Sequence, residues 1–215
     1  MAQWVLAALA PMQPDRCLAV VGHEAEAVKR AFGDRCEFVL QAEQRGTGNA
    51  VLTCENALKD LVGDALVISV DHPLMASEDL MRLVAHHRES RAEATVLFLR
   101  RENPVSYGRL VRDARDRVLR IVEEKDASPE ERQIRETNLG IYCFSLPGLF
   151  AALGKVDSNN AQGEQYLTDV IEILLQENKN VEAIAALNPA TGFGINTPEE
   201  LTKAEVILAK QISSR

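Results

Sequence analysis

The sequence predicts an α/β fold in which a largely parallel sheet is covered by helices on both faces. Several apolar runs of strand length are continuous instead of alternating, as in strands that are buried on both sides. Segments of helical pattern separate these runs. The chain has 215 residues, 46% of them hydrophobic, which suffices for one sizeable core. We therefore expect a single domain over residues 1–215.

The first hundred residues carry the alternation of strand and helix. The first helix is expected to end near Leu9, because Pro11 and Pro14 follow it. The predicted strands cover residues 16–22, 38–40, 65–70 and 94–99. The predicted helices between them cover residues 24–32, 49–59 and 77–87. Strands joined by helical crossovers are expected to run parallel.

The pattern changes in the second half of the chain. Residues 107–112 and 118–123 alternate around an Asp/Arg turn, which predicts an antiparallel hairpin. A strand at 138–144 follows, and then two helices and a further strand. The last helix is expected to begin near Pro198, since proline suits a first helical turn. We place an insertion at about residues 100–145 within the single domain.

Composition and charge exclude several classes of protein. The net charge of -8 and the pI near 5.1 provide no basic surface for nucleic acid. The sequence has neither an apolar run of membrane-spanning length nor a basic N-terminal leader, so we expect a cytoplasmic protein without a membrane partner. Its four cysteines form no C-x-x-C pair and are predicted to be buried free thiols in a reducing compartment. They are Cys17, Cys36, Cys54 and Cys143.

A glycine-containing loop joins the strand that ends at Leu40 to the next helix. Gly46 and Gly48 lie in this loop, and glycines at such a turn let the backbone approach a ligand closely. The N-terminus of the following helix attracts anions. By itself the pattern favours a capped turn, with Thr47 as the N-cap of the helix.

Asp71 directly follows the buried strand at 65–70. Ligands gather at the carboxyl ends of strands in open parallel sheets, so an acid there suits a hard divalent cation. The alternative is that Asp71 caps the following turn. The adjacent His72 is interpreted as a bystander, because nothing pairs it with a nucleophile. The remaining histidines are interpreted as turn and helix-end residues: His23, His86 and His87.

Three polar residues further along have two interpretations each. Glu123 ends the hairpin beside other charged residues, as part of a solvated cluster or as a contact to a sugar. Asn138 begins a strand, and its amide can donate to and accept from a sugar hydroxyl or acetamido group. Asn196 precedes the last helix, either as a cap or as an oxygen ligand for magnesium.

Seven segments, taken in order, carry a resemblance to a known family. They are L-Q-A-E-Q-R-G-T-G at 40–48, D-H-P-L at 71–74, Y-G-R at 107–109, I-V-E-E-K-D-A at 121–127, N-L-G-I at 138–141, N-N-A-Q-G-E-Q-Y-L-T-D at 159–169 and G-I-N at 194–196. Together they resemble the uridyltransferase domain of bacterial N-acetylglucosamine-1-phosphate uridyltransferases, within the nucleotide-diphospho-sugar transferases. The resemblance covers essentially the whole chain, and the order of the matches makes it specific. It implies a Rossmann-like, mostly parallel sheet with an antiparallel hairpin insertion on the sugar-binding side.

The resemblance also implies roles for residues near the nucleotide. Positions that match Gln41, Gly46 and Thr47 hold the uracil and adjacent parts of the nucleotide in this family. The positions that match Asp71 and Asn196 bind Mg²⁺, through which they act in catalysis. The implied nucleotide ligands are UTP and UDP-N-acetylglucosamine.

The same resemblance assigns Gly108, Glu123 and Asn138 to the N-acetylglucosamine moiety. The implied reaction joins UTP and N-acetylglucosamine 1-phosphate to give UDP-N-acetylglucosamine and pyrophosphate. It needs charge neutralisation and alignment more than a protein nucleophile.

The sequence departs from the family pattern at its start. The family opens with a central β-strand, a glycine-rich loop of the type L-x-x-G-x-G-T-x-M and a downstream lysine, whereas residues 1–5 resemble the helix that comes just after this segment. Val70 stands where the family has a glycine. The β-helical acetyltransferase domain of bifunctional members is also absent from this sequence, so acetyl transfer is not implied.

The missing central strand predicts a physical consequence. Either the strands at 16–21 and 65–70 close up against each other, or the chain is poorly stable, because each unpaired buried backbone group costs about 1–3 kcal/mol against a total stability of roughly 5–15 kcal/mol. Impaired activity is then expected. An internal methionine read as the start is one explanation, which the upstream coding frame tests. The alternatives are a non-catalytic binding or regulatory protein and a transferase for another sugar phosphate.

Overall fold

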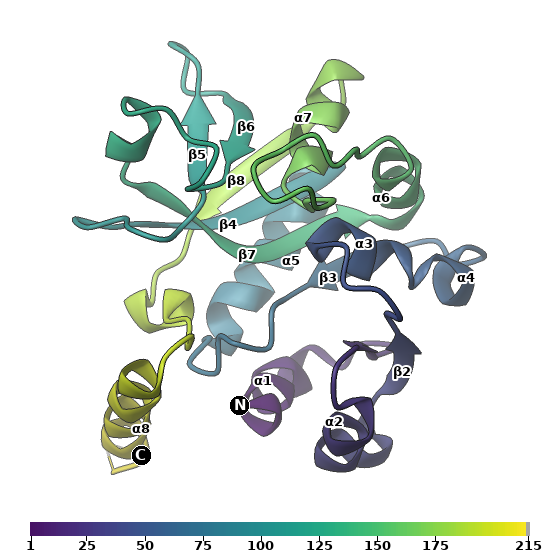
Figure 1. Cartoon of the computed structure of the whole chain (residues 1–215), viewed down its shortest axis with the longest axis vertical. Coiled ribbons are helices and arrows are strands. Elements are labelled where there is room, and N and C mark those ends of the chain that lie inside the picture. Colours follow the sequence, from purple (N-terminus) through teal and green to yellow (C-terminus); the bar gives the residue numbers. More distant parts are fainter. Residues whose placement is uncertain (214–215) are drawn as a thin grey trace.

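The computed structural model of the chain describes residues 1–213, with side chains up to residue 209, and has α/β architecture (Figure 1). Its helices are α1 (Ala2–Leu9), α2 (Ala25–Phe32), α3 (Thr47–Leu52), α4 (Glu55–Leu58), α5 (Ser77–Ser90), α6 (Leu146–Leu153), α7 (Asp169–Gln176) and α8 (Pro198–Ser213). Its strands are β1 (Leu18–Val21), β2 (Glu37–Leu40), β3 (Asp64–Val67), β4 (Ala94–Arg100), β5 (Arg109–Arg112), β6 (Val118–Val122), β7 (Glu136–Ser145) and β8 (Val181–Ala185). A short 3-10 turn, η4, covers Pro189–Gly192.

The larger sheet is built around β7. Its strand order is β6-β5-β7-β4-β8, and β3 also pairs with β7. β4 lies along one edge of β7, and the other edge is shared by β5 near Thr137 and by β3 at Tyr142 to Ser145. β3, β4 and β8 run in one direction and β7 runs against them. The α/β class and the predicted hairpin, β5 with β6, are therefore confirmed.

β1 and β2 form a separate two-stranded parallel sheet, in register from Leu18 opposite Glu37 to Val21 opposite Leu40. Of the two expected alternatives, closure of β1 against β3 is wrong, since β1 pairs with β2 alone and β3 with β7 alone among the described residues. The other alternative, poor stability of the chain, stays a prediction. Figure 1 shows β2 in a lower group with α1 and α2, apart from β3. β1 and β3 thus each keep one edge without a strand partner in residues 1–213.

Side-chain packing explains why the small sheet stays where it is. Leu18, Val20 and Val39 pack against the same apolar cluster as α6 and α7. Val5 and Ala8 of α1, the helix before β1, belong to the second cluster with α5. Apolar packing against the first cluster therefore holds β1 and β2 to the larger sheet, with no strand pairing between the two sheets in residues 1–213.

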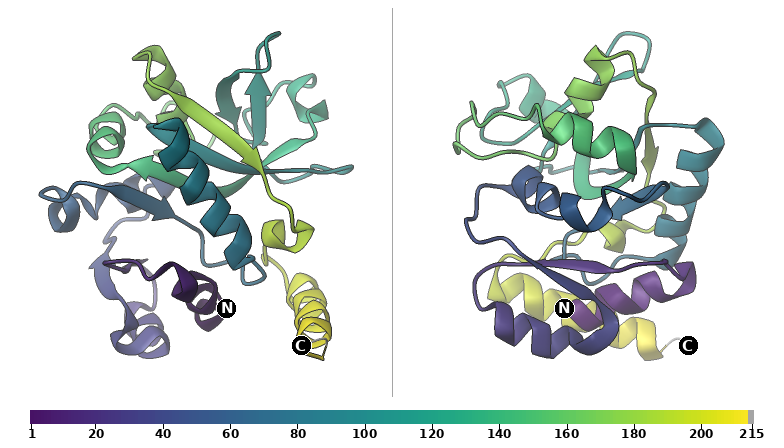
Figure 2. Two further views of the ribbon diagram at one scale, coloured as in Figure 1. Left: turned by 180° about the vertical axis from the view of Figure 1, so that it is seen from behind. Right: turned by 90° about the vertical axis from the view of Figure 1, so that its right-hand side faces the viewer.

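The two clusters lie on opposite faces of the larger sheet. Along β7, Tyr142 and Phe144 point into the cluster under α6 and α7, while Ile141 and Cys143 point into the cluster under α5. This alternation is the period of two that a strand imposes. Figure 2 shows α5 crossing the face opposite α6 and α7. The sheet is thus covered on both sides, as the sequence predicts.

Two predicted elements end earlier than expected. The helix predicted over 49–59 is divided into α3 and α4, and at the break the Thr53 hydroxyl donates to the carbonyl oxygen of Ala50. β3 ends at Val67, before residue 70, because its partner β7 bends at Gly140, which has φ +67°. Within residues 1–213 there is no helix with the length and apolar character needed to cross a bilayer.

Candidate active site

The side chain of Gln41 closes the glycine-containing loop after β2. Its Nε2 donates to the carbonyl oxygen of Gly46 at 3.2 Å and to Oδ1 of Asn49 at 3.0 Å. Gly46 has φ +107°, a conformation that favours glycine, and it is the N-cap of α3. The side-chain amide of Gln41 therefore holds the loop in its conformation by bonding Gly46 and Asn49.

The two glycines of this loop permit a close approach to another part of the protein. A Cβ on Gly46 would lie 2.6 Å from the carbonyl oxygen of Gln165, and one on Gly48 would lie 3.0 Å from the same atom. The Gly48 N–H donates to that oxygen at 2.8 Å, and the Thr47 hydroxyl accepts from the Leu167 N–H at 3.1 Å. Thr47 as N-cap was thus a wrong prediction, because its hydroxyl bonds a distant loop instead of its own helix.

Gly108, Glu123 and Asn138 come together as the sequence predicted. A Cβ on Gly108 would lie 3.3 Å from Oε2 of Glu123 and 3.5 Å from Cβ of Asn138. The Asn138 N–H donates to the carbonyl oxygen of Gly108 at 2.9 Å, at the junction of β5 and β7. The hairpin insertion therefore carries all three residues to one place. Their contact to a sugar stays a prediction.

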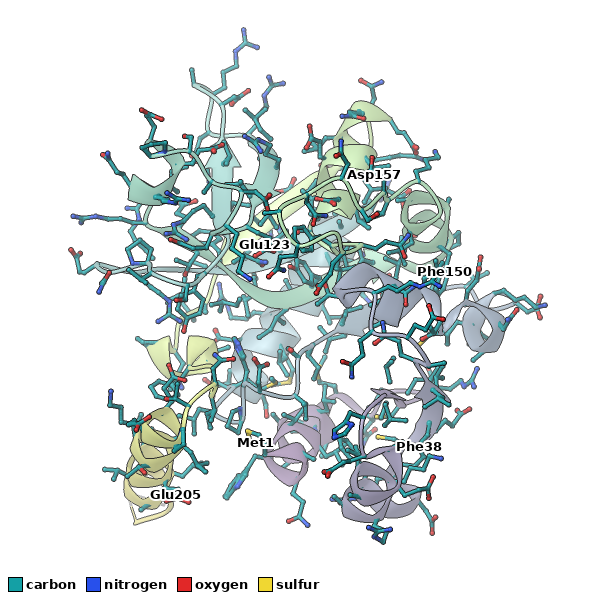
Figure 3. The ribbon with its side chains drawn as sticks, in the orientation of Figure 1. Met1, Phe38, Glu123, Phe150, Asp157 and Glu205 are labelled. Atoms are coloured by element: carbon teal, nitrogen blue, oxygen red, sulfur yellow. The ribbon has the colours of Figure 1, made fainter. Side chains whose placement is uncertain are left out.

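Glu123 is partly buried and is not a member of a solvated charge cluster. Its Oε1 accepts from the Thr168 hydroxyl at 3.1 Å, and burial raises the pKa of this carboxyl above its ordinary value. Figure 3 places Glu123 near the centre of the molecule, whereas Phe38 of β2 lies toward its lower edge. A carboxylate in this setting is a strong acceptor for a hydroxyl of a bound ligand.

The amide of Asn138 is held in place by its own strand. Its Nδ2 donates to the hydroxyl oxygen of Tyr142 at 2.6 Å, and its Oδ1 accepts from the Gly140 N–H at 3.2 Å. The second N–H and the second lone pair of the amide remain for a ligand. Nearby, the hydroxyl of Tyr166 is buried without a hydrogen-bond partner in the described residues. Buried polar groups are normally satisfied, so this hydroxyl is a further candidate for ligand contact.

Asp71 and Asn196 also lie close together. The Ile195 N–H donates to the carbonyl oxygen of Asp71 at 2.9 Å, which places the residue before Asn196 against the turn that follows β3. Oδ1 of Asp71 is buried and has no hydrogen-bond partner in the part of the chain that is described. An unpartnered carboxylate oxygen, with an asparagine in the neighbouring segment, fits a hard cation such as Mg²⁺, which takes few protein oxygens and fills its shell with water and phosphate oxygens.

His72 packs against Asp71 and Gly194. Its Nε2 lies 3.9 Å from Oδ1 of Asp71 and 3.1 Å from where a Cβ on Gly194 would be. Burial lowers the pKa of His72 despite the nearby carboxylate of Asp71. A neutral imidazole adds no positive charge beside a cation site. The cap interpretation of Asn196 is not required, because Thr197 and Glu200 already cap α8 through reciprocal hydrogen bonds.

Arg101 connects the two halves of the site, and sequence reasoning missed it. Its guanidinium lies over the ring of Tyr107, 4.1 Å from the centroid, and donates to the carbonyl oxygen of Gly192. The Tyr107 hydroxyl donates to the same oxygen at 3.4 Å. Gly192 lies shortly before Asn196 in the chain, and Tyr107 directly precedes Gly108. The guanidinium of Arg101, just after β4, therefore sets the spacing between the Asp71 side and the Glu123 side.

Other contributing residues were also unassigned at the level of sequence. Tyr166 and Thr168 lie inside the quoted Y-L-T-D segment, so the motif itself was the available signal. Arg101 offered only its place after a buried strand, where functional side chains gather.

The chain was compared with known protein families and solved structures. A family model described as "Nucleotidyl transferase" matches residues 1–188. The chain belongs to the nucleotidyl transferase family. This assignment agrees with the arrangement described above, in which candidate nucleotide, metal and sugar contacts lie beyond the strands of an α/β sheet.

Several curated relatives share this family. The nucleotidyl transferase chain is 41% identical over 213 residues to "Bifunctional protein GlmU" of Streptococcus mutans and to that of Enterococcus faecalis, matches that cover 99% of this chain and 46% of each relative. The GlmU of Streptococcus sanguinis is 40% identical over 215 residues, which cover 47% of that protein. The chain thus spans about half the length of the curated relatives it matches.

A solved structure shows the same fold. It is a UDP-glucose pyrophosphorylase complexed with UDP-glucose, with a TM-score of 0.72 over 97% of this chain and 86% of that chain. The sequence identity is 16%, so the likeness concerns the fold alone. It confirms the nucleotide-sugar transferase type of α/β fold that the sequence predicted.

Proposed function

We propose that this nucleotidyl transferase joins UTP and N-acetylglucosamine 1-phosphate to give UDP-N-acetylglucosamine and pyrophosphate, with Mg²⁺ as cofactor. The observation that carries the proposal is the meeting of Gly108, Glu123 and Asn138, with the hydroxyl of Thr168 bonded to Glu123. A carboxylate, an amide and a hydroxyl in one partly buried place suit a ligand rich in hydroxyl groups and bearing an acetamido group. The GlmU relatives support the same substrate class.

The reaction needs two ligands side by side. A phosphate oxygen of the sugar 1-phosphate attacks the α-phosphorus of UTP, the bond from that phosphorus to the bridging oxygen breaks, and pyrophosphate leaves with that oxygen. The glycine-containing loop at residues 41–48, called here the base-side loop, is hydrogen-bonded to the segment that carries Thr168. Gly48 and Thr47 make these bonds to residues 165–167. Because Thr168 bonds Glu123, both ligands are positioned by one connected piece of protein.

Asp71 and Asn196 are the residues that would hold the magnesium ion. The buried, unpartnered Oδ1 of Asp71 and the neighbouring amide supply two oxygen ligands. Bound there, Mg²⁺ would supply neutralisation of the phosphate charge. The side chain of Val70, just before Asp71, is 46% exposed and is therefore not part of the core.

The proposed substrate also bears on where the protein works. A nucleoside triphosphate substrate and four free thiols agree with a cytoplasmic enzyme that makes a precursor for cell-wall polymers. The net charge of -8 argues against nucleic acid as a partner.

A pyrophosphate-release assay tests the proposal directly. The complete chain is incubated with UTP, N-acetylglucosamine 1-phosphate and Mg²⁺, and we expect pyrophosphate and UDP-N-acetylglucosamine in equal amounts. Omitting Mg²⁺ or the sugar phosphate should abolish release. A panel of other sugar phosphates and nucleoside triphosphates is run in parallel. Faster turnover of another pair would replace the substrate assignment while leaving the reaction class intact.

A second candidate is a protein that binds UDP-N-acetylglucosamine without turnover. The observation that favours it is that β1 and β3 each have an edge without a strand partner in residues 1–213. The glycine-containing loop follows β2 of the small sheet, whereas Asp71 follows β3 of the larger sheet, so the two sides of the site belong to sheets that do not pair with each other. Any looseness between the sheets would misalign the two sides of the reaction. Calorimetry with UDP-N-acetylglucosamine separates the candidates: heat of binding without pyrophosphate release supports the second, and steady turnover removes it.

A further inference from the structure

Two of the four cysteines are neighbours in the small sheet. Sγ of Cys17 lies 2.7 Å from Sγ of Cys36. Each residue directly precedes a strand, and the register that pairs Leu18 with Glu37 places the two cysteines opposite each other. The Glu37 N–H also donates to the carbonyl oxygen of Cys17 at 2.8 Å. The backbone itself therefore holds the two thiols side by side.

The geometry of the pair is that of two thiols poised to bond. The sulfur separation is below the van der Waals contact of two sulfur atoms and less than 1 Å longer than a disulfide bond of about 2.05 Å. Neighbouring residues on paired strands have Cα atoms within the range that a disulfide bridges. The backbone therefore needs no large movement to accommodate a bond.

Solvent reaches this pair but not the other cysteines. Cys17 and Cys36 are half-buried, contrary to the sequence-based expectation of buried thiols, whereas Cys54 and Cys143 are buried. Around the pair, the Arg16 guanidinium bonds the carboxylate of Glu37 across the two strands at 2.8 and 2.5 Å. A small oxidant can therefore reach the first two thiols while the buried pair stays protected.

We propose that Cys17 and Cys36 form a redox-active pair that a peroxide oxidises to an intramolecular disulfide. The thiolate of one cysteine attacks a peroxide oxygen and the O–O bond breaks, which gives a sulfenic acid and, for hydrogen peroxide, a hydroxide that takes up the proton lost by the thiol to form one water. The other cysteine then attacks that sulfur as a thiolate, the S–S bond forms, the S–O bond breaks and the second water leaves. Two thiols are oxidised and one peroxide is reduced. A dithiol reductant reverses the reaction by thiol–disulfide exchange.

The surroundings of Cys36 disfavour its ionisation. Burial, followed by the contact with Cys17, raises the pKa of the Cys36 thiol. Since the thiolate is the reactive form of a cysteine, this raised pKa slows attack by Cys36 in either step.

The disulfide would brace the part of the fold that has the fewest strand partners. It would close a loop between residues 19 positions apart and fix the register of β1 and β2. At the other end of these strands, the Gln41 N–H donates to the carbonyl oxygen of Val21 at 2.8 Å, where the base-side loop begins. We expect oxidation to raise the midpoint of thermal unfolding by about 5–10 °C, by restricting the unfolded chain.

Peptide mapping provides the direct test. The full chain is treated with hydrogen peroxide, the remaining thiols are alkylated, and the protein is digested with trypsin. We expect one disulfide-linked species that joins residues 17–29 to residues 36–45, together with alkylated Cys54 and Cys143. Treatment with dithiothreitol should restore four alkylated cysteines and the lower unfolding midpoint. Cys17→Ser and Cys36→Ser should each lose the linked species and the thermal shift.

Two results would overturn the inference. One is four free thiols after oxidation of the folded wild-type chain. The other is a linkage that involves Cys54 or Cys143, or one between two copies of the chain. The test reads masses on the wild-type protein, so it does not depend on the folding of the variants or on the proposed uridylyl transfer.

Discussion

The backbone N–H of Ile195 donates to the carbonyl oxygen of Asp71 at 2.9 Å. This hydrogen bond joins the residues just before α8 to the turn that follows β3. This bond brings the segment of Asn196 to Asp71, whose Oδ1 is buried without a hydrogen-bond partner among the described residues. The two candidate metal ligands are thus positioned by the main chain and not by each other. Their side chains remain available for a cation.

Asp71→Asn is expected to lower kcat/KM by about 100-fold at saturating Mg²⁺, because it removes the charged oxygen proposed to hold the cation. The midpoint of thermal unfolding should stay within about 2 °C of wild type, since Oδ1 of Asp71 makes no hydrogen bond among the described residues. Initial rates over a Mg²⁺ titration measure the effect. Asp34→Asn, on the exposed surface, is the matched control. Unchanged Mg²⁺ dependence in Asp71→Asn would contradict the assignment.

Gly108→Ala should raise KM for N-acetylglucosamine 1-phosphate about 10-fold and leave KM for UTP unchanged. The added Cβ would lie 3.3 Å from Oε2 of Glu123 and would push this carboxylate from its place. Steady-state kinetics with each substrate varied in turn separates the two constants. Gly154→Ala is the control, because its Cβ meets nothing closer than 3.6 Å. Equal changes in both constants would mean that Gly108 does not serve the sugar side specifically.

Asp79→Ala is expected to lower the free energy of unfolding by about 3 kcal/mol. Asp79 is 1% exposed, and its carboxylate accepts from the N–H groups of Leu187 and Asn188 and from the Thr191 hydroxyl. Its removal leaves the buried Thr191 hydroxyl and the N–H groups of Leu187 and Asn188 without this acceptor and frees the turn η4. Urea denaturation measures the loss, with Glu78→Ala, an exposed neighbour on α5, as control. Similar losses in both variants would show that Asp79 is not the anchor of η4.

Stability should fall as the pH rises from about 4 to 6 because of Asp169. Burial, reinforced by the nearby carboxylates of Asp157 and Glu123, raises the pKa of Asp169 to about 6 from its ordinary 3.8. Between these values the folded state holds a proton that the unfolded state has lost, so the stability this proton provides is lost as the pH rises.

Asp169→Asn tests this linkage. The variant should be more stable than wild type by about 1–2 kcal/mol at pH 7, less than the full pKa shift implies because solvent screens this half-buried carboxyl, and the difference should shrink toward pH 4. Urea denaturation at several pH values measures the free energy of unfolding of both proteins. Carboxylates whose pKa is lowered, such as Asp113 and Glu200, contribute equally to both and drop out of the difference. A difference that is constant with pH would contradict a raised pKa at Asp169.

Backbone amides of β1 and β2 should exchange with solvent faster than those of β4 and β7. The first pair forms a two-stranded sheet, whereas β4 and β7 lie inside the larger sheet with partners on both edges. A two-stranded sheet is only marginally stable without packing, so it opens before the rest of the protein. Hydrogen exchange followed by mass spectrometry resolves the two regions. Equal protection in both would mean that the small sheet unfolds only together with the whole chain.

Local pattern determined much of this protein. Continuous apolar runs identified the buried strands, the alternation after residue 100 identified the β5–β6 hairpin, and ordered motifs identified Gly108, Glu123 and Asn138 as one group. These features depend on residues close in sequence and on a hydrophobic period that each element repeats. The family assignment follows from the same motifs.

Contacts between distant segments were decided only by the tertiary structure. Gly46 and Gly48 serve the close approach of Gln165 as well as their own turn, and Arg101 links Gly192 to Tyr107. β1 stays apart from β3 because its apolar side chains pack against the cluster under α6 and α7, whereas β3 pairs with β7. The sequence lists the side chains that can make such contacts, but the partner of each one depends on how the whole chain packs.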